Sequence, residues 1–336
     1  MRIGIAGAGL LGRLLAWRLA RAGHEVTAFD PMAGPERSGT YAAAFTAAGL
    51  LSPLAELDCG DADVAALGWR SLQLWPQWLR DIDEPVHFAQ RGSLLLAHPG
   101  DRGSAQRMLA HIQSQAPDHL PQQLDAQQLR ELEPALVRGL LAWHLAGEGQ
   151  IHTVQAMAAL HAAGTRAGVQ WRWGQAAAEV QPGRIDAERF DHVFDVRGLG
   201  ARPQLPLRGV RGEVFWLHAP GVPLNHPMRL LHPRHRVYLV PRPGDLIVVG
   251  ASEVESEDRS PVSVRSTLEL LSAAHSVIPE LSEARIVHSE SNLRPALPDN
   301  LPKLEREVGL VRINGLFRHG WLIGPALVEQ ALEGVL

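Results

Sequence analysis

The feature that most constrains this chain is a glycine-rich turn near its first residue. Residues 3–6 form a short apolar run, residues 10–22 repeat apolar side chains at helical spacing, and Gly7, Gly9 and Gly12 mark the junction. These patterns predict a buried strand that leads into a helix. The first glycine of such a turn permits a tight bend, the second lets backbone approach a pyrophosphate, and the third allows close helix–strand packing. The turn therefore predicts a dinucleotide site at the positive end of the helix.

An acidic residue at the end of the next predicted strand supports the same interpretation. Residues 25–29 read as a strand, and Asp30 follows it directly. A carboxylate there accepts hydrogen bonds from the adenosine ribose 2′-OH, which strengthens an otherwise weak glycine pattern. The negative charge would repel the 2′-phosphate of NADP. Asp30 does not separate NAD from FAD.

Length and composition limit the class of protein. The 336 residues exceed what one core usually supports, so we expect two domains. A net charge of −4 without a basic run argues against nucleic acid as a partner. Cys59 is the only cysteine, which excludes internal disulfides and CxxC metal sites. No stretch approaches the ~20 apolar residues of a membrane span, so we expect a soluble, cytoplasmic protein.

Strand–helix–strand patterns recur along the chain with β-rich segments between them. They stand at the start, near residues 153–200 and at the C-terminal end. This order predicts a nucleotide-binding domain that a second domain interrupts twice. Expected helices cover residues 64–79, 153–167 and the segment from about 322; expected strands cover 86–88 paired with 93–97, 169–173 and 190–196 in the nucleotide-binding sheet, 210–217, 228–231, 237–240, 246–249 and 310–313.

Two local signals predict where further helices begin. Asp125 followed by Gln128 fits a capping box, and Pro134 would end the short helix that follows. Ser260 and Pro261 predict the start of a longer helix, with serine as the N-cap and proline in the first turn.

Four segments together resemble the D-amino-acid oxidase family of flavoproteins. They are the N-terminal turn, residues 47–53, residues 238–252, and residues 292–302 with 315–326. Within the family the chain is most similar to the glycine oxidase branch, which supplies the glycine imine for the thiazole of thiamine. The resemblance covers essentially the whole chain. Leu-Arg-Pro at 293–295 and Arg-His-Gly-Trp-Leu at 318–322 are fairly specific to the family.

The resemblance implies an α/β fold with two domains. One is a Rossmann-like, FAD-binding domain of the glutathione-reductase type, and the other is an antiparallel β-sheet with helices that binds substrate. The FAD-binding domain is expected to be discontinuous, from residues 1–82, 140–208 and 290–336. The substrate-binding domain would then comprise residues 83–139 and 209–289.

The resemblance also implies where FAD is held. In the sarcosine-oxidase branch a cysteine close to the position of Asn292 carries the flavin covalently, and this chain has none there, so FAD is expected to be non-covalent. The implied FAD contacts are Gly7, Ala8, Gly9, Leu10, Leu11, Gly12, Asp30, Pro31, Thr46, Ala47, Ala48, Gly49, Leu50, Leu51, Ala177, Gly198, Arg318, His319, Gly320, Trp321 and Leu322.

Three side chains are expected to carry the chemistry. Arg294 would hold the substrate carboxylate through two parallel charge-assisted hydrogen bonds. Tyr238 matches a family tyrosine that binds the carboxylate or lines the pocket. Arg318 would add a second positive group over the substrate, and the N–H groups after it would stabilise negative charge on the reduced flavin.

The implied activity is oxidative deamination of glycine or another small amino acid or amine. A hydride passes from the substrate Cα to flavin N5, and the imine hydrolyses to an oxo acid and ammonia. Molecular oxygen then reoxidises the flavin and yields hydrogen peroxide. Three alternatives stay open: a dehydrogenase that passes electrons to a quinone or carrier, the flavin half of a tRNA-modifying protein, and a flavin-binding protein without turnover. A homo-oligomer also stays open.

Two further features bear on the site. Glu253 stands where some family members carry an apolar pocket residue; it either pairs with Arg242 or admits a more polar amine. His226, His232 and His235 cluster before the strand of Tyr238. They lack the i, i+4 helical spacing of zinc proteases, so we expect no metal.

Overall fold

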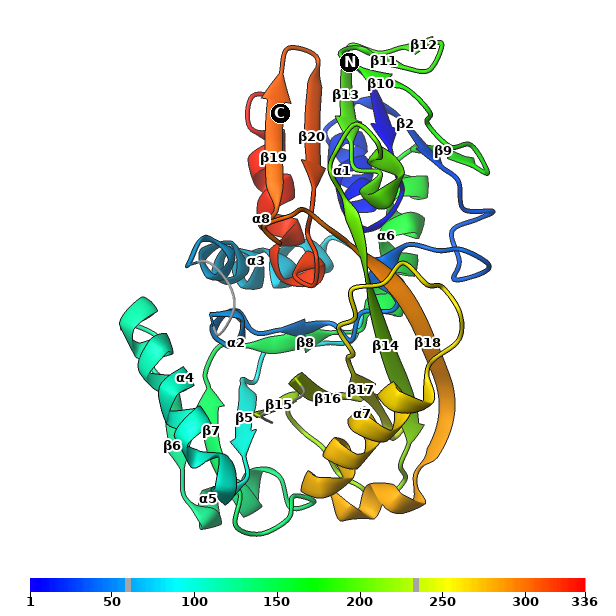
Figure 1. The fold of residues 1–336 in the computed structure, drawn as a ribbon. Coiled ribbons are helices and arrows are strands. Elements are labelled where there is room, and N and C mark those ends of the chain that lie inside the picture. Colours follow the sequence, from blue (N-terminus) through cyan, green and yellow to red (C-terminus); the bar gives the residue numbers. More distant parts are fainter. Residues whose placement is uncertain (58–61, 232–235, 336) are drawn as a thin grey trace.

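The chain folds into two halves, each built on one large β-sheet (Figure 1). The computed structural model describes residues 1–57, 62–231 and 236–335, so Cys59, His232 and His235 lie outside the described residues. None of the described helices combines the length and apolar character needed to cross a membrane.

The upper half in Figure 1 is a three-layer α/β unit. Its sheet has the order β19-β20-β13-β1-β2-β9, parallel except for β19 at the edge. Three helices share a core with Ile5 and Ala28 on one face of the sheet, and a small meander covers the other face. The strands are β1 (Arg2–Ala6), β2 (Glu25–Asp30), β9 (Gln170–Trp173), β13 (His192–Asp195), β19 (Lys303–Glu307) and β20 (Leu310–Asn314); the helices are α1 (Leu10–Arg21), α6 (Thr153–Arg166) and α8 (Gly320–Leu332); the meander is β10 (Val180–Gln181), β11 (Arg184–Ile185) and β12 (Glu188–Arg189).

The lower half is a mostly antiparallel sheet of order β18-β14-β17-β16-β15-β5-β7-β6, in which β15 and β5 alone run parallel. Helices α7 and α5 pack on one face, and α4 packs beside β5 and β7. The strands are β5 (Ser93–Ala97), β6 (Gln122–Leu124), β7 (Leu141–Leu145), β14 (Arg208–His218), β15 (Met228–Leu231), β16 (Arg236–Arg242), β17 (Leu246–Gly250) and β18 (Arg285–Ala296); the helices are α4 (Arg102–Gln115), α5 (Ala126–Leu132) and α7 (Val264–Val277).

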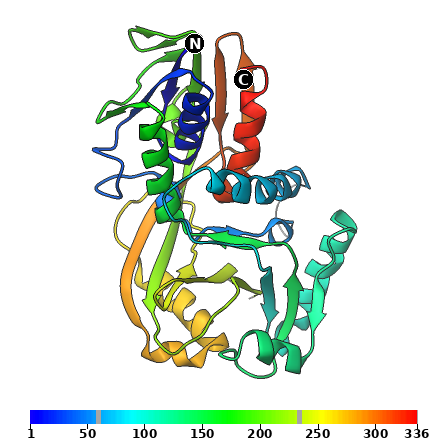
Figure 2. The same cartoon turned by 180° about the vertical axis from the view of Figure 1, so that it is seen from behind.

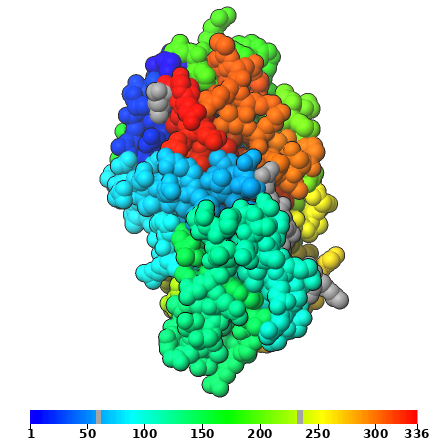
Figure 3. All heavy atoms as spheres, turned by 90° about the vertical axis from the view of Figure 1, so that its left-hand side faces the viewer, coloured from blue at the N-terminus to red at the C-terminus, as the bar shows by residue number. Residues whose placement is uncertain are grey.

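A small sheet and two helices lie where the halves meet (Figure 2). The sheet has the order β3-β8-β4, with β3 at Leu50–Leu51, β8 at Gly149–Ile151 and β4 at Phe88–Ala89. Helix α2 (Pro53–Glu56) leads toward α3 (Ala62–Arg80), which packs against α8. Figure 3 shows the first and last segments of the chain together in the upper half, because α1 also packs against α8.

Most of the expected elements are confirmed within one to three residues of their bounds, and the α/β fold class is confirmed. The capping box at Asp125 is also confirmed, because its carboxylate accepts the N–H groups of Gln127 and Gln128. The predicted pairing of residues 86–88 with 93–97 is wrong. β4 pairs with β8 and β5 pairs with β7 and β15, since the bend at Gly92 carries the chain from one sheet to another.

The predicted start of the long helix at Ser260 is wrong by several residues. The Ser260 hydroxyl donates to Asp258, and the Pro261 carbonyl accepts from Arg211, so this segment is held as a loop. Helix α7 begins at Val264 with Ser263 as its cap.

Two predicted boundaries between the two domains do not follow the strand pairing. The sequence prediction places residues from 140 onward in the FAD-binding domain, but β7 lies in the lower sheet beside β5. Likewise β18 pairs with β14 along its whole length, across the predicted boundary near residue 290. The division into an upper and a lower unit is retained here as our proposal.

A buried carboxyl group joins the small β3-β8-β4 sheet to the lower half. Glu148 is fully buried and accepts hydrogen bonds from the Ser52 hydroxyl, the Ser93 hydroxyl at 2.5 Å and the Leu54 N–H at 2.9 Å. Burial raises the pKa of Glu148 to about 7 despite these bonds, and the nearby charge of Glu56 adds to the rise.

This raised pKa predicts a pH-dependent stability. The folded state binds more protons than the unfolded state between the two pKa values of Glu148, so stability falls as pH rises from about 5 to about 7. Glu148→Gln cannot titrate but keeps an acceptor and donors for its three neighbours. Relative to wild type, its free energy of unfolding should rise by about 2 kcal/mol between about pH 5.5 and about pH 8.

Urea unfolding at both pH values measures this difference. Glu25→Gln is the matched control, because it makes the same substitution at a side chain that is 59% exposed. A Glu148→Gln protein whose stability follows the wild-type pH dependence contradicts the prediction.

Candidate active site

One large cavity lies between the two halves. It has a volume of about 1160 Å³ and is bordered by the glycine turn, residues 40–50, the turn after β13, strands β14 and β18, and the start of α8. Small-ligand pockets usually hold about 300–1,000 Å³, so the cavity has room for a large ligand.

The glycine turn has the geometry that close backbone approach requires. Gly7 has φ +102°, and a Cβ on Gly12 would lie 1.8 Å from the carbonyl oxygen of Gly7, so α1 packs directly on the turn. A Cβ on Gly9 would meet only Ala42, at 3.5 Å, because Gly9 borders the cavity. No side chain among the described residues caps α1. Its first N–H groups are therefore available to an anionic ligand.

Asp30 closes the same end of the cavity. It is 7% exposed and accepts hydrogen bonds from the N–H of Ala8 at 2.6 Å and of Met32 at 2.8 Å. Each carboxylate oxygen retains a further lone pair for a ligand hydroxyl. Its role toward the ribose stays a prediction.

A buried arginine fixes this turn from behind. Arg13 donates to the carbonyls of Ala8 at 2.9 Å, Met157 at 2.7 Å and Pro35 at 2.8 Å. Burial lowers its pKa to about 10, and the charge of Asp30 opposes that shift. Arg13 was not among the expected site residues; its position one residue after the third glycine, on a helix otherwise rich in apolar residues, is the signal that could have found it.

The start of α8 forms another wall of the cavity. Gly320, Trp321 and Leu322 border the cavity, and no side chain among the described residues caps this helix. The positive end of α8 therefore faces the cavity, as the positive end of α1 does.

Arg318 lies just before α8, with its charge paired. Its Nε and Nη2 lie 2.9 and 2.7 Å from Oε2 of Glu56, and its Nη1 lies 3.5 Å from Glu253. Burial alone would raise the pKa of Glu56, but Arg318 and His319 help to hold it well below its usual range. The suggested pairing of Glu253 with Arg242 is wrong, because Arg242 is buried and donates to backbone carbonyls and an amide instead.

Arg294 and Tyr238 lie on the same face of the lower sheet. The strand registers place Arg294 opposite Val210 and Tyr238 opposite Gly250, which in turn lies opposite Val214. Because alternate residues of a strand share a face, Gly212 lies on this face as well. The face is the one that borders the cavity.

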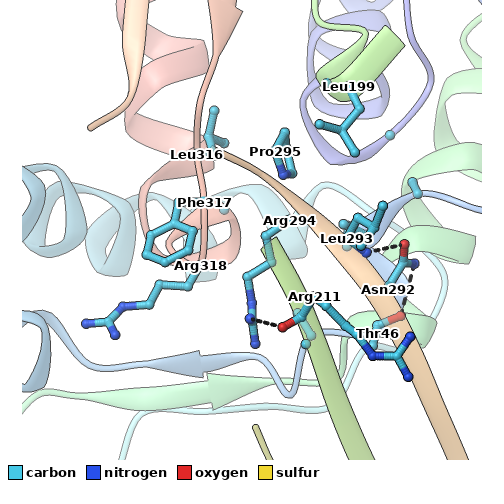
Figure 4. Close-up of a pocket in the computed structure, with 18 of the residues that line it drawn as sticks. Thr46, Leu199, Arg211, Asn292, Leu293, Arg294, Pro295, Leu316, Phe317 and Arg318 are labelled. Atoms are coloured by element: carbon cyan, nitrogen blue, oxygen red, sulfur yellow. Dashed lines mark hydrogen bonds between the residues drawn. The ribbon is translucent and has the colours of Figure 1, made fainter. Parts of the chain in front are cut away.

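Two glycines make room for these side chains. A Cβ on Gly212 would lie 2.4 Å from Nη2 of Arg294, and one on Gly250 would lie 2.8 Å from the Tyr238 ring. The guanidinium leans over β14, where Nη1 donates to the Arg211 carbonyl at 3.5 Å (Figure 4). The same Nη1 also donates to the Ser252 carbonyl at 3.1 Å. Sequence reasoning missed both glycines, because only the strand register shows what lies over them.

The charge of Arg294 is not matched by an acid. Within the part of the chain that the structure describes, no carboxylate forms an ion pair with it. Burial raises the pKa of Tyr238, and the Arg294 cation opposes that rise, so the phenol stays protonated. A guanidinium and a phenol hydroxyl thus stand side by side, ready to bind a carboxylate.

Asn292 lies two residues before Arg294 on the same strand face. Its amide donates to the Tyr41 carbonyl and the Thr46 hydroxyl, both at 3.2 Å (Figure 4). It thereby ties β18 to the segment that contains the predicted Thr46–Leu51 contacts. An amide cannot form a thioether, which agrees with the expectation of a non-covalent flavin.

The structure brings most of the predicted contacts to one cavity, and four lie behind its wall. Ala8, Gly12, Leu51 and His319 are buried without bordering it. The expected residues that border it are Gly7, Gly9, Leu10, Leu11, Asp30, Pro31, Thr46, Ala47, Ala48, Gly49, Leu50, Ala177, Gly198, Arg318, Gly320, Trp321, Leu322, Tyr238 and Arg294; those that the sequence did not suggest include Phe29, Tyr41, Glu56, Arg197, Leu199, Arg229 and Phe317.

The histidines before Tyr238 do not form a described metal site. His226 is buried, and its Nδ1 lies 2.7 Å from Glu133. Among the described residues, no group of three or more His, Cys, Asp or Glu side chains is arranged to hold a metal ion.

The cavity fits a flavin dinucleotide. Its glycine turn, Asp30 and the α1 N-terminus suit an adenosine pyrophosphate, and the α8 N-terminus suits a ring that gains negative charge. The volume and the two uncapped helix starts fit FAD better than a mononucleotide.

Comparison with known proteins agrees that the chain is an FAD-binding protein. The family described as FAD dependent oxidoreductase (DAO) matches residues 2–331. A thiamine biosynthesis oxidoreductase named ThiO, from Rhizobium etli, is 36% identical over 100% of this chain and 97% of its own length. Glycine oxidase of Geobacillus kaustophilus is 28% identical over 96% of this chain and 89% of its own length.

Solved structures give the same result. The crystal structure of that Geobacillus glycine oxidase matches with a TM-score of 0.85 at 24% identity, covering 99% of this chain and 94% of its own. An iminodiacetate oxidase from Chelativorans matches with a TM-score of 0.83 at 25% identity, covering 98% and 93%. Sequence, fold and cavity thus lead to one conclusion: the chain belongs to the DAO family of FAD-dependent oxidoreductases and is of the glycine oxidase and ThiO type.

Proposed function

We propose that this enzyme oxidises glycine or another small amino acid that carries one carboxylate, with oxygen as the electron acceptor. The observation that carries the proposal is the Arg294 guanidinium, which lies over Gly212 beside Tyr238 without a carboxylate partner among the described residues. Such a pair binds a carboxylate in a fixed orientation. The names of the relatives, glycine oxidase and a thiamine biosynthesis oxidoreductase, support the substrate class.

The neighbouring charges favour a substrate with a single carboxylate. Arg318, the other cation that we expected over the substrate, is shared by Glu56 and Glu253. A second substrate carboxylate at that position would meet two like charges, which costs free energy. A small zwitterion therefore suits the cavity better than a dicarboxylic amine.

The residues of the chain bind and orient, while the cofactor supplies the redox step. Arg294 and Tyr238 hold the carboxylate, which fixes the position of the adjacent Cα. The N-terminus of α8 supplies preorganised dipoles toward the cavity. Bound FAD would supply the acceptor for the hydride of the substrate Cα.

Anaerobic mixing tests the proposal. The yellow protein is mixed with glycine, sarcosine and D-alanine, and the flavin absorbance should bleach with at least one of them. Readmitted air should restore the colour with about one peroxide per substrate, since two electrons pass in each turnover. Bleaching without peroxide would indicate a dehydrogenase that uses another acceptor, and no bleaching with any of the three would refute the proposal.

Loss of the Arg294 guanidinium should weaken substrate binding strongly. Arg294→Ala should cost about 2–5 kcal/mol in affinity for the carboxylate substrate, as expected when one partner of a desolvated charge pair is removed. The dissociation constant from anaerobic flavin reduction measures it. Arg166→Ala is the control, because that arginine is 46% exposed and lies at the end of α6. Equal affinity of Arg294→Ala and wild type would show that Arg294 does not bind the carboxylate.

Gly212→Ala should act through the same guanidinium. The added Cβ would lie only 2.4 Å from the present position of Arg294 Nη2 and 2.5 Å from that of Cζ, so the guanidinium would have to move. The Gly212 backbone does not have a positive φ, so alanine can adopt its conformation. We expect substrate affinity to fall about tenfold with little loss of folding stability, since the end of a flexible side chain moves.

A double-mutant cycle identifies the cause. In an Arg294→Ala background, Gly212→Ala should have no further effect on affinity, because the two changes remove one interaction. Additive losses would mean that Gly212 acts independently of Arg294.

A further inference from the structure

Arg242, at the end of β16, is a buried cation on the face of the lower sheet that borders the cavity. It lies two and four residues from Val240 and Tyr238, so the three side chains share this face. Arg242 is 5% exposed. It does not itself border the cavity.

Among the described residues, all hydrogen-bond partners of Arg242 are neutral. Its Nη2 donates to the Ala48 carbonyl and to the Ile151 carbonyl at 2.9 Å, and its Nη1 donates to the Gln150 side chain at 3.0 Å. Over the described ranges, no carboxylate forms an ion pair with it, and its Nε has no hydrogen-bond partner. Burying an unpaired charge is costly, so such a residue is a candidate for a functional role.

The charge lies directly behind the cavity wall. Ala48 and Gly49 border the cavity, and a Cβ on Gly49 would lie 3.2 Å from Nη2 of Arg242. One layer of backbone thus separates the guanidinium from the cavity. At this depth water screens little, so the field of the cation extends into the cavity.

Nearby groups do not cancel this field. Burial first, and then the charge of Arg242, lower the pKa of His152 to about 4, and the pKa of His87 is lowered for the same reasons. Both imidazoles are therefore neutral at pH 7. The charge of Arg318, unlike that of Arg242, is compensated by two carboxylates, Glu56 and Glu253.

We propose that Arg242 tunes the flavin from behind the wall, by stabilising the negative charge that the ring gains on reduction and so raising its reduction potential. Arg242 acts across the backbone of Ala48 and Gly49 and does not contact the substrate or the ring. Its effect on the flavin is therefore electrostatic and indirect. The inference rests on FAD binding, which family membership shows, and is independent of the proposed substrate.

Gln150→Glu tests the proposal with Arg242 in place. The new carboxylate would lie about 3 Å from Nη1, within ion-pair distance, and would neutralise the cation while its bonds to Ala48 and Ile151 remain. Sulfite, which adds to oxidised flavins as an anion, should bind about tenfold more weakly, and the flavin midpoint potential should fall by about 30 mV, the two-electron equivalent of a factor of ten.

Three further variants separate charge from structure. Arg242→Gln removes the cation and should show the same losses, whereas Arg242→Lys keeps the cation and should stay within about twofold of the wild-type sulfite affinity. Gln90→Glu adds the same negative charge at an exposed site and should change neither quantity.

The outcomes decide between tuning and a purely structural role. If Arg242→Gln fails to fold, Gln150→Glu still decides, because it keeps every backbone contact of Arg242. A yellow Gln150→Glu protein with wild-type sulfite affinity and potential would overturn the proposal. A folded Gln150→Glu protein that no longer holds FAD would overturn it as well, since Arg242 would then serve binding and not redox tuning.

Discussion

The pairing of β14 with β18 is the interaction on which the site depends. These two strands are paired from Arg208 opposite Ala296 to His218 opposite Arg285, and they run from the lower sheet up to the junction with the dinucleotide-binding half. Their register places Arg294 beside Gly212, and it places Asn292 where it binds Thr46. One strand pair therefore fixes Arg294, which we propose binds the substrate carboxylate, relative to the segment around Thr46 that borders the cavity.

Charge around the cavity is distributed unevenly, and this unevenness suits the chemistry. Arg318 is compensated by two acids, Arg294 has no acid among its described partners, and Arg242 is buried among carbonyls, an amide and neutral imidazoles. Together with the two uncapped helix starts, Arg294 and Arg242 place positive charge at particular points around the cavity. Such charges stabilise the pyrophosphate of FAD and a reduced flavin, and they would stabilise the carboxylate of the substrate that we propose.

The sequence predicted what short-range signals determine. The glycine turn with Asp30, the parallel strands around it and the capping box at Asp125 all depend on residues close together in the chain, and the structure confirms each of these elements. The resemblance to a family supplied Arg294, which no periodicity identifies. The first kind of signal comes from residues close together in the chain, and the second comes from the resemblance to a family. Neither requires knowledge of how distant segments pack.

The remaining features depend on contacts between distant segments. Ser260 loses its role as a cap because Arg211, some fifty residues earlier, holds the adjacent carbonyl in a loop. Glu148 has a raised pKa because the folded chain buries it between distant segments, and the hydrogen bonds from Ser52 and Ser93 offset only part of that rise. Likewise Gly212 is needed because β18 passes beside it, and its sequence neighbours carry no sign of that need.

Arg242 shows why such residues are hard to find from sequence and why they matter. A cation buried without an acid lowers stability, and a chain selected for folding alone would place a neutral side chain there. Its contacts with Ala48 and Ile151 offset part of that cost by joining the segment before β3 to the end of β8. Glutamine could make similar contacts without the desolvation cost of a charge. The charge itself is therefore the property that the fold does not require, and the cavity one backbone layer away is where it has an effect.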